Sequence, residues 1–208
     1  LDGTCEDAAY AAANSLQLRP YGAEAQASVR LLHNGTELWV CFSGLQPGAT
    51  DPGAYVGVRV DGNNSRDALA GAGDIGLFAG EDGDVFTLVG DGAGGWTAGG
   101  EDGLQAQVMA GNGAWSAELR IDAALLGGWG HLAGLAFGHY SVKAAGDDYA
   151  WPYTASPAAP NSWALTALGS QPIITALDPY TAAVGGPAFA LQVEGSGYVT
   201  GTQVLWNG

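Results

Sequence analysis

The chain has 208 residues, of which 47% are hydrophobic and 13% charged, so it has enough apolar side chains for a core and lacks the composition of a disordered protein. Its 21 acidic residues outnumber six basic ones and give a formal net charge of -15. Basic surfaces bind nucleic acids and anionic membranes, so this charge argues against both as partners, and no apolar run approaches the roughly 20 residues of a membrane-spanning helix.

Glycine separates short apolar runs along the whole chain. The 35 glycines lack the three-residue period of collagen, and the runs between them are rich in Val, Leu, Tyr and Trp. Short runs of this kind, bounded by turn residues, are typical of β-strands. We therefore predict an all-β protein.

The predicted elements begin with residues 6–18, which have a local preference for helix. Hydrophobic and other residues then alternate in SVRL (28–31) and again in VGVRV (56–60), as in half-buried strands. ELWVCFSGL (37–45) is the clearest strand, and Asn34-Gly35 before it is typical of a tight hairpin turn. We therefore expect antiparallel neighbours in this part of the chain.

The later runs with strand character are bounded by Gly, Asp or Asn, and they are DIGLFAG (74–80), DVFTLVG (84–90), LQAQVMAGNGAWSAELRI (104–121) and LAGLAFGHYSV (132–142). DAALLGG (122–128) favours a single helical turn. Prolines impose an extended connection on residues 154–162, and WALTALG (163–169) is the predicted last strand of a first domain. Many short strands at this spacing predict an antiparallel sandwich or barrel.

The two cysteines, Cys5 and Cys41, are candidates for a disulfide. Cys41 lies in the predicted strand 37–45, so a bridge would fasten the N-terminal segment to the sheet and, in the loop-closure model, stabilise the fold by roughly 3–4 kcal/mol. It would also imply an oxidising compartment. The alternative is a pair of buried free thiols.

Two N-glycosylation sequons, at Asn34 and Asn63, lie in turn-like stretches that can accommodate a glycan. Such triplets also arise by chance. They are compatible with an exported protein and do not establish export.

Several segments, in order, resemble family 9 carbohydrate-binding modules and their DOMON-like relatives. LDGTCEDAAYAAANSLQL (1–18) is similar to their opening segment, and ELWVCFSGL followed by YVGVRVDGNNSRD (55–67) is similar to their core strands. AWSAELRIDAALLGG (114–128) is similar to a strand and turn of these modules, except that Ile121-Asp122 replaces Ile-Pro. The resemblance covers residues 1–169 and implies a jelly-roll-like β-sandwich that binds glycans.

Residues 171–208 resemble the first half of an immunoglobulin-like IPT/TIG domain, with a Gly-Gly pair in the middle and VLWNG at the end. The resemblance implies a second domain, residues 170–208, that is a partial immunoglobulin-like sandwich. Such domains have further strands. We expect that the domain is cut at Gly208, that its remaining strands belong to a longer chain, or that a neighbouring copy supplies them.

No catalytic constellation is evident in the sequence. The histidines show no HExxH spacing, and no GxSxG or P-loop motif occurs. A glycosidase needs two carboxylates on either side of a sugar, and Glu118 and Asp122 can lie near each other on a strand. In the family that this strand resembles, however, an acidic residue is a common structural feature. We therefore predict a protein that is not an enzyme.

A calcium site is predicted in DGNNSRD, where oxygen-bearing side chains recur at Asp61, Asn63, Ser65 and Asp67. Arg66 stands where an EF-hand has glycine, so this is no EF-hand. The resemblance to family 9 modules implies structural calcium. The alternative is a turn whose side chains cap its own backbone.

Sugar binding requires exposed aromatic rings. The candidates are Trp96 in a predicted glycine-rich loop, and Trp151, Tyr153 and Trp163 around the Pro-rich segment. The resemblance suggests that a pair of tryptophans clamps the end of a glycan. The alternative for each ring is a place in the core or over the end of the sandwich.

Two functions follow from these features. The first is a secreted, non-catalytic binding module of the cell surface with a glycan as ligand. The alternative is a structural subunit of an extracellular filament or layer, in which a neighbouring copy completes the partial IPT-like domain.

Overall fold

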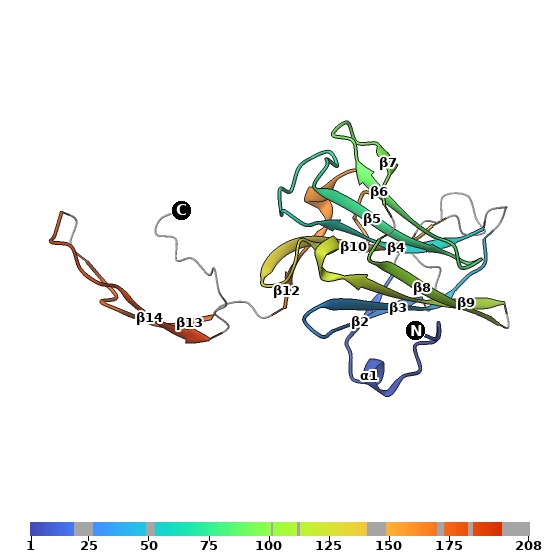
Figure 1. Cartoon of the computed structure of the whole chain (residues 1–208), viewed down its shortest axis with the longest axis horizontal. Helices are drawn as coiled ribbons and strands as arrows, with labels where there is room; N and C mark the ends of the chain where they lie inside the picture. Colours follow the sequence, from blue (N-terminus) through green and yellow to red (C-terminus); the bar gives the residue numbers. More distant parts are fainter. Residues whose placement is uncertain are drawn as a thin grey trace.

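The computed structural model describes residues 1–18, 27–48, 53–100, 102–111, 113–140, 149–169, 173–182 and 185–196. Two antiparallel sheets pack face to face in a sandwich, and a separate two-stranded hairpin follows (Figure 1). Within these residues, no helix is long and apolar enough to span a membrane. The predicted all-β class and antiparallel sandwich are confirmed.

The first sheet contains five strands in the order β1-β2-β3-β9-β8. Their bounds are β1 Ser15–Gln17, β2 Ser28–His33, β3 Glu37–Leu45, β8 Leu104–Gly111 and β9 Ala114–Asp122. The predicted run 104–121 is thus two strands, β8 and β9, paired as a hairpin. The turn between β2 and β3 contains Asn34-Gly35, as the sequence predicts.

The second sheet contains seven strands, six of them in the order β11-β10-β4-β5-β6-β7, with β12 also paired to β10. Their bounds are β4 Tyr55–Asp61, β5 Asp74–Gly80, β6 Val85–Gly90, β7 Trp96–Ala98, β10 His131–Tyr140, β11 Tyr149–Trp151 and β12 Ala164–Leu168. Two of these strands, β7 and β11, are only three residues long and were not predicted.

The core lies between the two sheets and follows the predicted alternation. Val56, Val58 and Val60 of β4 are buried in it, while Arg59 and Asp61 point to the opposite, outer face of the second sheet. Burial of each such valine contributes roughly 1.5–3 kcal/mol. The alternation therefore decides which side chains of β4 are free to form a site.

Aromatic rings cover the outer face of the second sheet because glycines lie beneath them. A Cβ at Gly76 would lie 2.5 Å from a ring carbon of Phe78, and a Cβ at Gly138 would collide with the Tyr140 hydroxyl. The Phe78 ring is stacked on Phe86, with centroids 4.9 Å apart. The glycines of this sheet are thus explained by the rings that rest on them.

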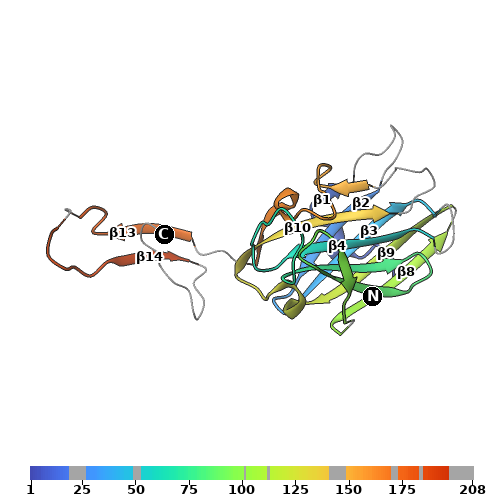
Figure 2. The same ribbon diagram turned by 90° about the horizontal axis from the view of Figure 1, so that it is seen from above.

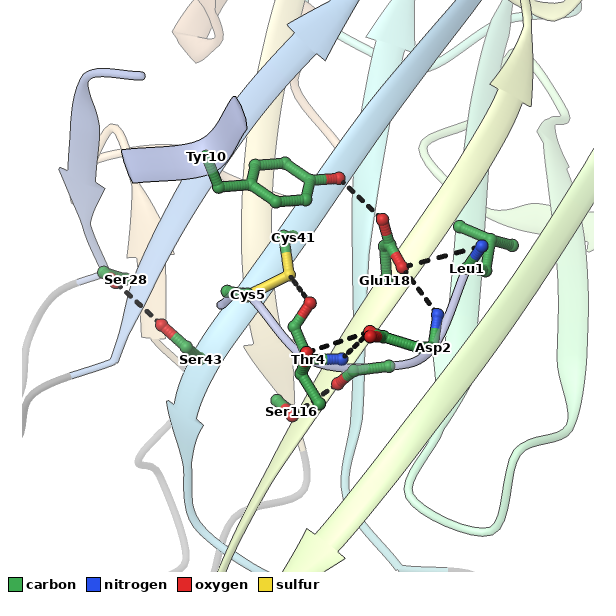
Figure 3. Close-up of a disulfide and its surroundings, with 11 residues drawn as sticks. Leu1, Asp2, Thr4, Cys5, Tyr10, Ser28, Cys41, Ser43, Ser116 and Glu118 are labelled. Atoms are coloured by element: carbon green, nitrogen blue, oxygen red, sulfur yellow. Dashed lines mark hydrogen bonds and ion pairs between the residues drawn. A yellow bond between two sulfur atoms is a disulfide. The ribbon is translucent and has the colours of Figure 1, made fainter. Parts of the chain in front are cut away.

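The N-terminal segment lies against the outer face of the first sheet, below β2 and β3 in Figure 1. A disulfide joins Cys5 to Cys41 of β3, with the two Cα atoms 5.7 Å apart, so the predicted bridge is confirmed (Figure 3). The helix predicted over 6–18 is wrong in extent. Helix α1, Ala8–Ala11, is one turn, because short isolated helices are marginal and tertiary contacts decide the rest.

The single turn predicted at residues 122–128 is confirmed as the 3₁₀ helix η1, Ala123–Leu126. It ends at Gly127, whose φ of 83° lies in the left-handed region that favours glycine. A second 3₁₀ helix, η2 Pro160–Ser162, precedes β12. It lies within the predicted proline-rich connection.

A hairpin of β13, Ile173–Asp178, and β14, Gln192–Ser196, forms a sheet of its own. It stands apart from the sandwich in two perpendicular views (Figures 1 and 2). Large apolar side chains on its described part, such as Phe189, are exposed. The described residues show a hairpin there and no immunoglobulin-like sandwich, so the IPT/TIG resemblance and the boundary at 169/170 stay predictions.

Candidate functional site

A groove opens between an edge strand of each sheet. Strand β1 is at one end of the first sheet and β11 at one end of the second. The groove has a volume of about 360 Å³, and it is lined by Ser15, Leu16, Gln17, Trp151, Pro152 and Tyr153. Two of the four predicted sugar-binding rings therefore lie in one concave site.

The two rings of the groove are held differently. Trp151 ends β11 and is half-buried, with its ring centroid 5.9 Å from that of Phe137 in the core. Tyr153 follows it and is 69% exposed. Tyr153 thus offers an open ring to a ligand, whereas Trp151 lines the groove and also packs against the core.

Polar side chains come from β1 on the other side of the groove. The Gln17 amide donates a hydrogen bond to the Ser15 hydroxyl over 3.2 Å, and both side chains are exposed. Neither residue was predicted as a site residue, because both lie in the segment 6–18 that was expected to favour a helix. Their alternation with Leu16 and Leu18 is the period-two signal that could have found them.

The other two predicted rings lie elsewhere, on the outer side of the second sheet. Trp96 and Trp163 are stacked with centroids 6.4 Å apart and ring planes at 17°. Trp96 begins β7 and does not lie in a loop, contrary to the prediction, because it pairs with Gly90 of β6. A glycine-rich segment gave no strand signal there.

Trp163 is 2% exposed, and its indole N–H donates to the Ser156 carbonyl oxygen over 2.8 Å. Carbon atoms in contact lie about 3.5–4.0 Å apart, so a sugar held between two rings needs about 7–8 Å. The 6.4 Å between these rings is too short. In this structure Trp163 lies stacked on Trp96 over the sheet, and sugar binding by this pair of rings stays a prediction.

The predicted calcium loop caps its own backbone. Both carboxylate oxygens of Asp61 accept backbone N–H groups, from Ser65 over 2.9 Å and from Arg66 over 2.8 Å. The Asn63 amide oxygen also accepts from the Ser65 N–H. Among the described residues, no group of three or more His, Cys, Asp or Glu side chains could hold a metal ion.

Unpaired oxygens next to this loop nevertheless suit a hard cation. Asp74 lies directly opposite Asp61 in the β4–β5 pair, and its Oδ2 accepts from Gly71 N–H over 2.7 Å. The Oδ1 atoms of Asp74 and Asn64 are buried, and neither has a hydrogen-bond partner among the residues that the structure describes. Burial raises the pKa of Asp74 above its ordinary value, and the nearby Asp61 and Asp67 add to this.

Calcium takes oxygen ligands of these types, so Asn64 and Asp74 would complete a site with Asp61. The sequence analysis named neither residue as a ligand. The calcium site itself stays a prediction.

Both sequons are exposed. Asn34 lies in the β2–β3 turn, where its amide oxygen accepts from the Thr36 N–H and hydroxyl over 3.0 and 2.9 Å. Asn63 lies in the turn after β4. Glycosylation at either position stays a prediction.

The carboxylate of Glu118 is hydrogen-bonded to the N-terminal segment. It is buried on the outer face of the first sheet, where Oε1 accepts from the Tyr10 hydroxyl and Oε2 from the Asp2 N–H, each over 3.0 Å (Figure 3). These contacts anchor the N-terminal segment. Glu118 does not line the groove between β1 and β11.

The sequence matches no family profile and no curated protein. The fold does match solved structures. A family 9 carbohydrate-binding module from Caldicellulosiruptor kristjanssonii in complex with cellotriose aligns with a TM-score of 0.60 and 14% identity, over 79% of this chain and 86% of that one. The same kind of module from that organism in complex with glucose aligns with a TM-score of 0.61 and 13% identity, over 79% and 87%. The chain therefore has the sandwich fold of family 9 carbohydrate-binding modules.

Proposed function

We propose that this protein binds glycans without catalysis, in the groove between β1 and β11. The observation that carries the proposal is the exposed ring of Tyr153 beside Trp151, facing polar side chains of β1 in one concave site. The fold supports it, because structures with the same sandwich hold cellotriose or glucose.

The groove has the physical properties that sugar binding needs. Tyr and Trp rings stack on the apolar face of a pyranose at little entropic cost, and the Ser15 and Gln17 side chains can hydrogen-bond its hydroxyls. A volume of about 360 Å³ lies in the range of small-ligand sites. We therefore infer a short oligosaccharide, or the end of a longer one, as the ligand.

An extracellular or cell-surface location belongs to the same proposal. The Cys5–Cys41 disulfide persists in oxidising compartments and is rare in the cytosol. A glycan-binding module acts where polysaccharides or cell-surface sugars occur. The confirmed bridge and the groove thus support one location.

The test is titration calorimetry with cellotriose and with glucose. Tyr153→Ala should weaken binding at least about tenfold, or 1.4 kcal/mol, because the exposed ring is lost without damage to the core. Tyr180→Ala is the matched control, since Tyr180 is 83% exposed on the separate hairpin. Unchanged affinity in Tyr153→Ala would reject the groove as the site.

A second candidate function is assembly through the hairpin of β13 and β14. The observation that favours it is the exposure of Ile174 on β13 and of Tyr180 and Phe189 in the connection between β13 and β14. A two-stranded sheet is marginal in isolation. In this role a neighbouring copy of the chain covers the hairpin. Light scattering tests it: ordered polymers that Phe189→Ser disperses would support assembly, and a monomer at all concentrations would reject it.

A further inference from the structure

Strand β8 is at one end of the first sheet, and its outer edge is open. It pairs with β9 on one side only. Among the described residues, the one hydrogen bond that reaches its backbone from outside the β8–β9 pair joins the Gln107 amide to the Val108 carbonyl oxygen over 3.4 Å. The N-terminal segment comes close at Gly3, where a Cβ would lie 2.7 Å from the Val108 carbonyl carbon, and it makes no hydrogen bond there with the backbone of β8.

This edge lacks the features that keep sheet edges from pairing. Such features are short length, bulges, charged side chains and proline. Strands β1, β7 and β11 at the other ends of the sheets have three residues each, whereas β8 has eight. Its register with β9 is unbroken from Leu104 to Gly111. Its sequence, LQAQVMAG, contains no proline and no charged residue, in a chain with 21 acidic residues.

Both faces of β8 carry apolar side chains that a further strand would cover. Ala106 and Val108 pack against the core but are only half-buried, since β8 is the last strand of its sheet. Gln107 and Met109 point to the opposite face, and Met109 is 50% exposed. An added strand would therefore bury apolar surface on both faces and bond the open backbone groups.

We propose that β8 pairs antiparallel with β8 of a second copy of this chain. The edge is complementary to itself about a two-fold axis. With the axis at Gln107, the two Gln107 side chains lie opposite each other, and Gln105 lies opposite Met109 of the partner subunit. The strand pair brings together neutral side chains only, so two copies with a net charge of -15 each meet there without a like-charge pair. A charged peptide strand finds no opposite charge on β8.

The length of β8 limits the strength of this dimer. Eight residues at about 3.4 Å each span roughly 27 Å, and one strand pair of this length belongs to the small interfaces of weak, transient complexes. The net charge of each copy opposes association, and salt screens this repulsion. We therefore expect a concentration-dependent dimer that becomes tighter as salt is added.

The dimer joins two sandwiches through one continuous sheet. The five strands of each first sheet then lie in the order β1-β2-β3-β9-β8-β8-β9-β3-β2-β1. At about 4.8 Å between neighbouring strands, the two β1 strands lie roughly 43 Å apart. Each β1 lines one groove, so the dimer presents two grooves to one polysaccharide. This last consequence alone rests on the proposed function, and the pairing of β8 does not.

Sedimentation velocity of the whole chain, without glycan, tests the dimer over a wide range of protein concentration and at low and high salt. Gln107→Lys should weaken the dimer at least about tenfold, because it places two like charges opposite each other at the axis. Gln107 is exposed, so the fold should be kept. Gln192→Lys is the matched control, since Gln192 is exposed on the separate hairpin, and it should leave the dimer intact.

Cysteine variants test the register and do not depend on the folding of Gln107→Lys. In Gln107→Cys the two new thiols face each other across the axis, within the Cα separation that a disulfide needs, so mild oxidation should link the two copies. Gln105→Cys is the matched control, because the residue opposite it is Met109 of the partner subunit. It should link the copies at least about tenfold more slowly, since its two thiols lie several residues apart.

A monomer at every concentration would overturn the proposal. A dimer that Gln107→Lys leaves intact would also overturn it, and its dispersal by Phe189→Ser would assign the contact to the hairpin of β13 and β14. Equal rates of linkage for Gln105→Cys and Gln107→Cys would overturn the pairing about Gln107. These outcomes leave the groove untouched, because glycan titration tests it separately.

Discussion

The two outer faces of the sandwich differ in how their buried polar groups are paired. On the first sheet, the N-terminal segment is fixed by the Cys5–Cys41 bridge and by hydrogen bonds to Glu118 (Figure 3). On the second sheet, buried atoms of Arg59, Asp74 and Trp96 have no hydrogen-bond partner in the described part of the chain. Buried polar groups cost free energy unless they are paired, so the paired groups of the first face hold the N-terminal segment in place, and the unpaired groups of the second face are positions where water, an ion or a ligand can bind.

The disulfide should have the largest effect on stability of any feature of the first face. Replacing both Cys5 and Cys41 with Ser should lower the free energy of unfolding by about 3–4 kcal/mol, because the closed loop spans a sequence separation of 36 residues. Guanidinium unfolding with and without reductant measures this. Identical midpoints for the oxidised chain and the variant would show that the segment is held by its other contacts.

The second-largest effect on stability should come from His139, and it depends on pH. Burial lowers the pKa of His139 to about 4, against a smaller opposite effect of its hydrogen bond with the Gln46 carbonyl oxygen. The neutral ring is therefore favoured in the folded state, so stability is full above pH 6.5 and falls as the pH drops from 6.5 to about 4. The loss should reach about 3 kcal/mol.

Unfolding free energies measured across that pH window check the His139 prediction. His139→Gln should flatten the part of the curve that this residue causes. A variant with the same slope as the unmodified chain would assign the acid sensitivity to other groups.

Tyr10→Phe should have the third effect, because it breaks a buried pair on the first face. The variant removes the hydroxyl that donates to Glu118 and leaves a carboxylate oxygen without that partner. The cost should be about 1–3 kcal/mol. Tyr153→Phe is the control, since the Tyr153 ring is exposed, and equal losses for the two variants would contradict the role assigned to the Glu118 pair.

The sequence predicts the sandwich better than it predicts the sites, for a physical reason. Val56, Val58 and Val60 alternate with period two, which is a local signal of one buried face. Arg59 and Trp96 meet only because β4, β5, β6 and β7 pair in that order, and such pairing is not local. The burial of Trp163 likewise depends on its contact with Ser156 in the preceding loop.

The short strands were missed for a related reason. Strands β1 and β7 have three residues each, one within an alanine-rich segment and the other within a glycine-rich one. Three residues carry too little periodicity to be recognised, although β1 places Ser15 and Gln17 in the proposed groove.

Asp74→Asn should have the smallest effect on stability. Whether it raises or lowers the melting temperature distinguishes a cation site from a carboxylate that is only unpaired. The pKa of Asp74 is raised above its ordinary value of 3.8, so the charged carboxylate is less favourable in the folded state than in the unfolded state. This lowers the stability of the folded state at pH values above 3.8, including pH 7. Asp74→Asn should therefore raise the melting temperature slightly in a chelator, where no cation compensates the charge.

With calcium, the unmodified chain should melt at a higher temperature than Asp74→Asn, the reverse of the result in a chelator. The reason is that an ion bound by Asp61, Asn64 and Asp74 stabilises only the folded state. The unmodified chain should gain a few degrees in melting temperature with calcium, and Asp74→Asn should gain none. Gains of equal size in both chains would place the ion elsewhere, and no gain in either would leave Asp74 as an uncompensated charge next to Asp61.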